Sequence, residues 1–182
     1  MTVFISGGCK NGKSSFAEAL ACKLRKPDAP LYYLATMVPT DHEDEARIKR
    51  HQEARAGMGF TTIEAGRDVL SVLLPSIDFS GTLLLDSTTA LLANEMFAAD
   101  PEGQIQYSAH VKVADDVVQL VDRFDSTVIV SDYIYSDAFL YDDLTEAYRR
   151  GLAYIDRQLA KHCDVVVEVC LGQRIIHKGR LP

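Results

Sequence analysis

Short apolar runs alternate along the chain with longer segments in which apolar residues recur every three or four positions. A short apolar run is typical of a buried strand, and a period near 3.6 is typical of an amphipathic helix. The runs predict a first strand that begins at Val3 and further strands at 31–36, 60–64, 82–86, 127–131, 164–170 and 175–178. The periodic segments predict helices at 16–21, 41–56, 68–74, 89–97, 105–124 and 144–162. Uniformly apolar strands that alternate with helices indicate an α/β fold, with a mostly parallel central sheet and helices on both faces.

The composition is that of an ordinary globular domain. The chain has 182 residues, of which 47% are hydrophobic and 25% are charged. It contains no repeat or linker, so we expect residues 1–182 to form a single domain with a substantial core. A net charge of −7 without a basic block argues against a nucleic-acid partner. We expect a cytoplasmic protein with reduced thiols, because the chain shows no membrane span, no secretion signal and no metal-site spacing of its four cysteines.

The clearest motif follows the first predicted strand. Residues 7–14 read G-G-C-K-N-G-K-S, which fits the phosphate-binding pattern G-x-x-x-x-G-K-[ST]. The glycines let the backbone approach phosphate oxygens, and successive N–H groups and the following helix attract the anion. Lys13 would reach the β- and γ-phosphates as a catalytic residue, and the Ser14 hydroxyl would bind Mg²⁺. The nucleotide-binding residues predicted from this loop are Gly7, Gly8, Cys9, Lys10, Asn11, Gly12, Lys13 and Ser14.

Two further strand ends are expected at the same edge of the sheet. Asp86 ends the apolar run T-L-L-L-D, and an acid at this place beside a phosphate loop is typical of the residue that positions Mg²⁺, directly or through water. An acid after an apolar strand is a weak signal alone, and the phosphate loop strengthens it. Residues 35–37 end the second strand at the carboxyl edge, where ligands bind in open α/β sheets.

The first long predicted helix is densely charged, and Thr40 and Glu43 have the spacing of a capping box at its start. Arg47, His51 and Arg55 recur every four residues and therefore share one face. Two cations that flank a histidine would hold phosphates while the imidazole acts as a nucleophile. The alternative is a solvated charged helix with an idle histidine, and the spacing alone favours that alternative.

An acidic and aromatic stretch follows the strand predicted at 127–131. Residues 132–143 contain three tyrosines and four aspartates. Such a stretch would line a substrate pocket or form an ordinary surface loop, and the pattern does not decide between the two.

Together these motifs resemble the bifunctional adenosylcobinamide kinase/adenosylcobinamide-phosphate guanylyltransferase family of cobalamin biosynthesis, over nearly the whole chain. Residues 7–14 are similar to the family's GGxxSGKS, 33–36 to its YIAT, 45–55 to its E-x-x-R-I-x-x-H-x-x-x-R, 62–64 to its T-[VI]-E, and 85–87 with Asn94 to its D-C-x-T-x-x-x-x-N. The element around His51 is the specific one, because most phosphate-loop proteins lack it. The resemblance implies the P-loop NTPase fold of the RecA-like type.

The family also implies a role for each matched position. His51 would be the catalytic residue that takes GMP from GTP as a covalent phosphoramidate, which reverses the preference set by spacing alone. Nucleotide contacts outside the phosphate loop are implied for Ala35, Thr36, Met37, Gln52, Glu53, Ala54, Arg55, Glu64 and Asp86, with Ser14 and Asp86 at Mg²⁺. GTP and ATP would be substrates, adenosylcobinamide or a related corrinoid would be the acceptor, and the assembly would be a homotrimer.

Two departures fall in the half expected to meet the corrinoid. The family's N-E-V-G-x-G-I/V-V-P is replaced by S-D-Y-I-Y-S-D-A at 131–138, and Asp156 stands where the family's G-x-x-N-Q-x-[IL]-A has asparagine. The protein would therefore keep both activities, keep one, or act on a variant substrate. One competing interpretation is a monofunctional small-molecule kinase in which His51 is idle. Another is a nucleotide-switched regulator, which ranks last because the N-K-x-D and D-x-x-G elements of GTPases are absent.

Overall fold

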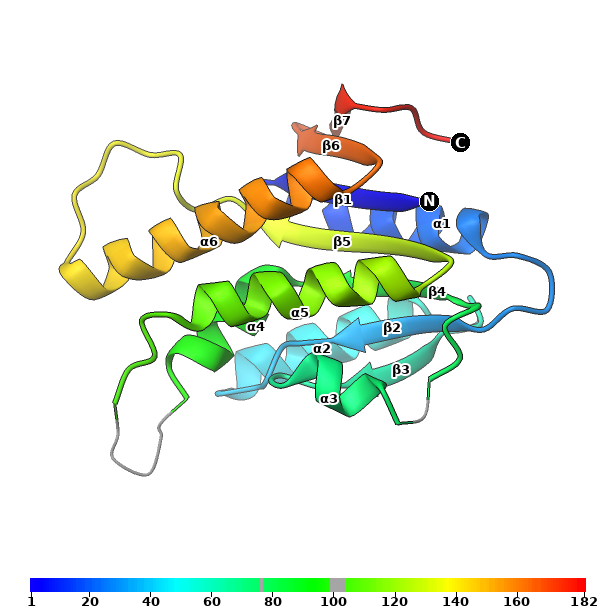
Figure 1. The fold of residues 1–182 in the computed structure, drawn as a ribbon, viewed down its shortest axis with the longest axis horizontal. Helices are drawn as coiled ribbons and strands as arrows, with labels where there is room; N and C mark the ends of the chain where they lie inside the picture. The colour runs from blue at the N-terminus through cyan, green and yellow to red at the C-terminus, as the bar shows by residue number, and fades with distance from the viewer. Residues whose placement is uncertain (76, 99–103) are drawn as a thin grey trace.

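A computed structural model describes residues 1–75, 77–98 and 104–182, with the backbone but not the side chain of Arg47. The order of the elements confirms the predicted alternation of strands and helices (Figure 1). The elements are β1 (Thr2–Gly7), α1 (Lys13–Leu24), β2 (Leu31–Ala35), α2 (His42–Ala54), β3 (Thr61–Glu64), α3 (Val69–Leu73), β4 (Thr82–Asp86), α4 (Thr88–Met96), α5 (Ala109–Arg123), β5 (Ser126–Asp132), α6 (Asp143–His162), β6 (Val165–Cys170) and β7 (Gln173–Lys178).

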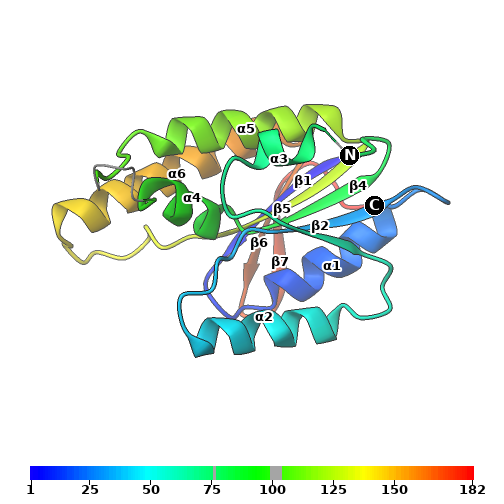
Figure 2. The ribbon, with the colours of Figure 1, turned by 90° about the horizontal axis from the view of Figure 1, so that it is seen from below.

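The described strands form one sheet in the order β3-β2-β4-β5-β1-β6-β7. Neighbouring strands are parallel except β6 and β7, which are antiparallel, so the mostly parallel sheet is confirmed. Helices α1 and α2 cover one face, and α3 to α6 cover the other (Figure 2). Because strand side chains alternate between the two faces, the core is divided into a cluster under α1 and a larger cluster under α3 to α6.

Helix α5 shows how the periodic pattern works and where it misleads. Its buried residues recur with helical spacing and are Ala109, Val113, Ala114, Val117, Leu120 and Val121. The prediction that this helix begins at residue 105 is wrong, because α5 begins at Ala109. Residues 107–108 form a turn, and the N–H of Gln106 donates to Met96 O at 2.9 Å instead of continuing a helix.

The start of α2 also differs from its prediction. The capping box expected at Thr40 and Glu43 is wrong by one residue, because Asp41 is the N-cap and its Oδ1 accepts a hydrogen bond from Asp44 N at 2.9 Å. Asp44 Oδ2 in turn accepts from Thr40 N at 3.1 Å and from Thr40 Oγ1 at 2.8 Å. The aspartates are favoured here because their short carboxylates reach the unpaired N–H groups of the first turn.

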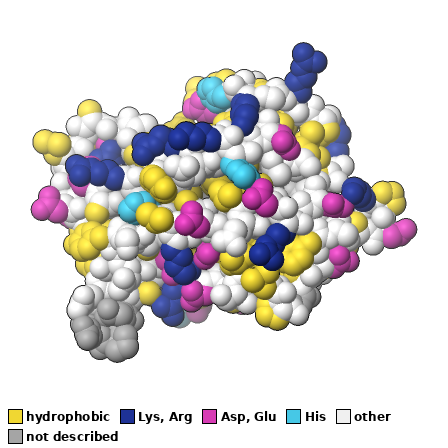
Figure 3. Space-filling model, in the orientation of Figure 1, with side chains coloured by type: hydrophobic (Ala, Val, Ile, Leu, Met, Phe, Trp, Pro, Cys, Tyr) yellow, Lys and Arg dark blue, Asp and Glu magenta, His cyan; other side chains and the backbone are white. Residues whose placement is uncertain are grey.

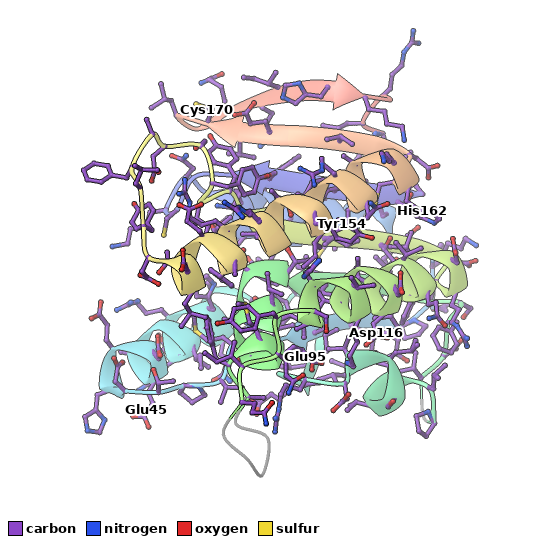
Figure 4. All side chains as sticks on the ribbon, turned by 60° about the vertical axis from the view of Figure 1, so that its left-hand side comes forward. Glu45, Glu95, Asp116, Tyr154, His162 and Cys170 are labelled. Carbon is purple, nitrogen blue, oxygen red and sulfur yellow. The ribbon has the colours of Figure 1, made fainter. Side chains whose placement is uncertain are left out.

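Charged side chains of both signs lie on the outer helices. Lys112 of α5 contacts Glu95 of α4 at 2.7 Å and Asp116 of its own helix at 3.0 Å, and Figure 4 shows the two carboxylates on their helices. On the face seen in Figure 3, acidic and basic side chains are interspersed. Within the described ranges, no helix combines the length and the apolar character needed to cross a membrane.

The parallel strands bring residues that are distant in the sequence to one edge. Strands β1, β2, β4 and β5 all end at the edge on the left of Figure 1. Their last residues are Gly7, Ala35, Asp86 and Asp132. The residues predicted from separate motifs therefore meet at the carboxyl edge of the sheet, where open α/β folds bind ligands.

Candidate nucleotide-binding site

The loop between β1 and α1 has the backbone geometry that anion binding requires. Gly12 has φ 83° and ψ 15°, a left-handed conformation that favours glycine, directly before α1 begins at Lys13. A Cβ atom on Gly7 would lie 2.4 Å from Val169 O, so no larger residue fits there. The first N–H groups of α1 have no intrahelical acceptor and lie at the positive end of the helix dipole, so they attract a phosphate.

Lys13 is folded back over this loop. Its side chain is 5% exposed, and its Nζ donates to Gly8 O and to Asp132 Oδ1, each at 2.6 Å. The phosphate-loop motif predicts the phosphate contact of Lys13 but not this carboxylate partner, which is 119 residues away. The signal that would have found Asp132 is the one that identified Asp86, a carboxylate at the end of an apolar strand.

Asp86 is held by a side chain from the neighbouring strand. Its Oδ2 accepts a hydrogen bond from Tyr33 OH at 2.9 Å, and the Arg55 guanidinium lies 3.8 Å from the centroid of the Tyr33 ring. Burial raises the pKa of the Tyr33 hydroxyl, and the negative charge of Asp86 raises it further. Tyr33 therefore stays protonated and orients the Asp86 carboxylate near Ser14, with which Asp86 lines the same two cavities.

A second carboxyl group lies buried near Asp86. Glu18 of α1 is 3% exposed, and its Oε1 has no hydrogen-bond partner among the described residues. Burial raises the pKa of Glu18 and the charge of Asp86 raises it further, while Arg55 lowers it. No sequence pattern indicates a role for Glu18, because a glutamate within a good helix-forming segment is ordinary.

Two cavities meet at this edge. The first has a volume of about 480 Å³, is mostly apolar and is lined by α2 and the ends of β2 and β4; we call it the apolar cavity. The second has a volume of about 360 Å³, is more polar and is lined by residues 10–15; we call it the phosphate-loop cavity. Ser14, His51 and Asp86 line both cavities, so His51 lies on the shared wall. Figure 4 labels Glu45, another residue of α2 that lines the apolar cavity.

Most of the residues predicted to bind the nucleotide line these two cavities. Those in the apolar cavity are Ser14, Ala35, Met37, His51, Gln52, Arg55, Glu64 and Asp86. Those in the phosphate-loop cavity are Lys10, Asn11, Gly12, Lys13, Ser14, His51 and Asp86. Gly7, Gly8, Cys9, Thr36, Glu53 and Ala54 line neither of these two cavities. Thr36 is buried and exchanges hydrogen bonds of 2.8 Å with the backbone of Ser87, which ties the end of β2 to the end of β4.

Of the two cations predicted beside His51, only Arg55 has a described side chain. The side chain of Arg47 lies outside the described part of the structure. Arg55 is the C-cap residue of α2, is 6% exposed, and its Nη2 donates to Thr62 Oγ1 at 3.4 Å. Its N–H donates to His51 O at 3.3 Å, so Arg55 remains one helical turn from His51, and both line the apolar cavity.

Of the stretch 132–143, Asp132 ends β5 and Asp143 begins α6, and the residues between them form a loop that Arg149 of α6 holds in place. The buried guanidinium donates to Phe139 O at 3.3 Å, to Asp137 O at 3.3 Å and to Asp137 Oδ1 at 2.8 Å. Asp132, at the start of the stretch, lines the phosphate-loop cavity, whereas Phe139 near its tip is 75% exposed. The loop thus begins at the site and extends into solvent.

Asp156 lies under this loop, at the position where the family pattern has asparagine. It is 4% exposed, and its carboxylate accepts hydrogen bonds from Ser131 Oγ at 2.8 Å and from Tyr135 OH at 2.7 Å. Burial raises the pKa of Asp156 to about 6, and the two hydrogen bonds offset part of that effect.

We expect Asp156→Asn to stabilise the protein at neutral pH. Because the folded pKa is raised above the reference value of 3.8, the stability contributed by Asp156 is full below about pH 4 and is lost as the pH rises through about 6. At neutral pH the ionised carboxylate therefore costs on the order of 3 kcal/mol of unfolding free energy, which a neutral amide avoids. Urea unfolding at neutral pH should show the gain, and the gain should vanish at about pH 4. An equal gain at both pH values would contradict the ionisation of Asp156 as its cause.

The phosphate loop after the first parallel strand, the buried Lys13, and Asp86 beside Ser14 define a P-loop nucleotide-binding protein of the α/β class. Solved structures share this fold. A protein of Pyrococcus horikoshii OT3 has a TM-score of 0.55 at 11% identity, over 98% of this chain and 86% of that one. A solved ATPase domain has a TM-score of 0.53 at 10% identity, over 98% of this chain and 77% of that one. At such identities the likeness shows the fold alone.

The chain belongs to the cobinamide kinase / cobinamide phosphate guanyltransferase family, whose sequence model matches residues 3–176. This confirms the resemblance drawn from the motifs. Members of the family are kinase and guanyltransferase enzymes.

Three relatives show how far the similarity extends. The chain is 32% identical over 126 residues to the bifunctional adenosylcobalamin biosynthesis protein CobU of Salmonella typhimurium, over 66% of each chain. It is 29% identical over 97 residues to the Escherichia coli protein of the same name, over 53% of this chain and 51% of that one. It is 25% identical over 179 residues to the bifunctional adenosylcobalamin biosynthesis protein CobP of Pseudomonas aeruginosa, over 98% of each chain. The match therefore spans just under two thirds of the Salmonella protein, about half of the Escherichia coli protein and nearly all of the Pseudomonas protein.

Proposed function

We propose that residues 1–182 form one P-loop transferase domain that acts as an adenosylcobinamide kinase and adenosylcobinamide-phosphate guanylyltransferase. The first reaction transfers a phosphoryl group from GTP or ATP to a corrinoid hydroxyl. The second transfers GMP from GTP to the phosphorylated corrinoid through a covalent intermediate on His51. The observation that carries the proposal is the position of His51 on the wall shared by the two cavities.

In this proposal a single GTP molecule spans both cavities. Its β- and γ-phosphates lie on the N–H groups of the phosphate loop and against Lys13. Its guanosine occupies the apolar cavity, which leaves the α-phosphorus at the shared wall beside His51. An imidazole nitrogen then forms a bond to the α-phosphorus, and the bond from that phosphorus to the pyrophosphate oxygen breaks. Lys13 and the loop hold the departing pyrophosphate.

The oxygen atoms at this edge fit Mg²⁺. Ser14 offers a hydroxyl and Asp86 a carboxylate, both hard ligands, and both residues line the phosphate-loop cavity. The described residues contain no group of three or more His, Cys, Asp or Glu side chains that would form a protein cage for a metal. Mg²⁺ is typically held by one or two protein oxygens together with phosphates and water, and when bound it would neutralise phosphate charge. Tyr33 would keep the Asp86 carboxylate oriented toward it.

Turnover of adenosylcobinamide with GTP and Mg²⁺ tests the proposed function. We expect a phosphorylated corrinoid first and a GDP-linked corrinoid second, and α-³²P-GTP alone should label the protein. A phosphorylated corrinoid without the GDP-linked product would contradict the guanylyltransferase half and favour a monofunctional kinase with His51 idle. Nucleotide-dependent binding of a partner without turnover of any corrinoid would favour a regulator.

A further inference from the structure

Asp132 has a position that nucleotide binding alone does not explain. Its Oδ1 accepts the hydrogen bond from Lys13, and its side chain is 21% exposed where it lines the phosphate-loop cavity. Within the described residues, its Oδ2 makes no hydrogen bond. A carboxylate repels a nearby phosphate, and the proposed function already assigns Ser14 and Asp86 to Mg²⁺, so holding the triphosphate does not require this group.

The backbone of Asp132 is fixed relative to the phosphate loop. Its N–H donates to Thr89 Oγ1 at 2.8 Å, and Asp132 is in register with Gly7, the last residue of β1. The next residue, Tyr133, donates its N–H to Gly7 O at 3.3 Å. The carboxylate is therefore carried by the rigid end of a central strand, as the positioning of a reacting group requires.

Asp132 and His51 both line the phosphate-loop cavity, and the proposed function assigns them to different parts of the triphosphate. Lys13 contacts the β- and γ-phosphates in phosphate-loop proteins, and Asp132 contacts Lys13, so Asp132 lies toward the γ-phosphate. His51 lies on the shared wall, toward the α-phosphate. From Asp132 the chain runs into the loop clamped by Arg149, at the same carboxyl edge of the sheet (Figure 1).

We propose that Asp132 is the general base of the phosphoryl-transfer step, a role that rests on the proposed kinase activity. Oδ2 accepts the proton of the acceptor hydroxyl while the hydroxyl oxygen attacks the γ-phosphorus. The acceptor O–H bond breaks and the new O–P bond forms. The bond from the γ-phosphorus to the β-phosphate oxygen breaks, and the nucleoside diphosphate leaves with that electron pair. A carboxylate that accepts the substrate hydroxyl proton serves the same purpose in protein kinases.

A different role for the carboxylate would have the opposite consequence. If Asp132 only competed with phosphate for Lys13, removing its charge would tighten nucleotide binding and leave transfer equal or faster. As a general base, its removal slows transfer without weakening nucleotide binding. The sign of the change in transfer rate therefore separates the two roles.

The experiment compares Asp132→Asn with Asp143→Asn, which neutralises an exposed carboxylate in the first turn of α6. Transfer of ³²P from γ-³²P-GTP to adenosylcobinamide should fall at least about 100-fold in Asp132→Asn. In the same variant, the loss of GMP labelling by α-³²P-GTP should be roughly ten times smaller than the loss of phosphoryl transfer. Asp143→Asn should match the wild type in both assays. Added formate should restore part of the transfer rate in Asp132→Ala, because a small carboxylate can enter the vacated space, but not in Asp132→Asn.

Each of the following outcomes would contradict the role of Asp132 as the general base. Wild-type or faster transfer in Asp132→Asn would show that the carboxylate is not the base. Equal losses of transfer and of GMP labelling, with no response to formate in Asp132→Ala, would show a structural residue. Failure of the wild-type protein to phosphorylate adenosylcobinamide would contradict the proposed function and this role together. Normal wild-type transfer with an unaffected Asp132→Asn variant would overturn this role alone.

Discussion

Replacing Lys13 with alanine is expected to abolish both nucleotide-dependent reactions while the protein stays folded. The lysine provides a charge-assisted contact to the β- and γ-phosphates, and loss of one such contact costs about 2.7–4 kcal/mol, roughly a hundredfold to a thousandfold in rate. The substitution also removes the partner of Asp132, so an unpaired carboxylate then faces the triphosphate. We therefore expect a loss beyond that of the single contact.

Two further variants separate these contributions. Lys23→Ala removes a lysine from the last turn of the same helix, where its Nζ donates to Pro182 O, and should behave as the wild type. Combining Lys13→Ala with Asp132→Asn removes the repulsion and should recover part of the GTP affinity, but not phosphoryl transfer. Calorimetric titration with GTP and steady-state turnover measure the two effects. Wild-type turnover in Lys13→Ala would contradict the phosphate-loop assignment.

Local sequence predicts the elements of this fold because their burial is regular. Strand β4 has four successive buried residues, which reflects a sheet covered on both faces. The order of the strands is not predictable in this way, because β1 pairs with β5 and β6, which come much later in the chain. Element ends are also set by single hydrogen bonds, and this is why the predicted starts of α2 and α5 are wrong.

The same distinction applies to the site. The phosphate loop is contiguous in the sequence, so its backbone role follows from the motif alone. The contact between Lys13 and Asp132 and the burial of Glu18 depend on the packing of α1 against strands far along the chain. The end of an apolar strand indicates a carboxylate at Asp132, but no short pattern pairs it with Lys13. The position of Arg55 is predictable from the sequence only in part. Its spacing from His51 is correct, but its stacking on Tyr33 requires the neighbouring strand β2.

Replacing His51 with alanine is expected to abolish labelling of the protein by GMP, and with it guanylyl transfer. A covalent intermediate needs a nitrogen with a free lone pair near the α-phosphorus, and an alanine side chain has none. The loss should therefore be complete rather than graded. Phosphoryl transfer should fall far less, because Lys13, Ser14 and the loop N–H groups hold the γ-phosphate without His51.

His42→Ala is the matched control for this prediction. His42 is the first residue of α2, the helix that carries His51, and its exposed ring contacts Glu45 at 3.1 Å. After incubation with α-³²P-GTP, wild-type and His42→Ala proteins should carry label that is stable in base and lost in acid, as a phosphoramidate requires, and His51→Ala should carry none. Label that persists in His51→Ala, or that mass spectrometry maps to another residue, would contradict both the nucleophile assignment and the bifunctional mechanism. The two histidines differ in the cavities that they line rather than in their helix, so this pair of variants tests the shared wall itself.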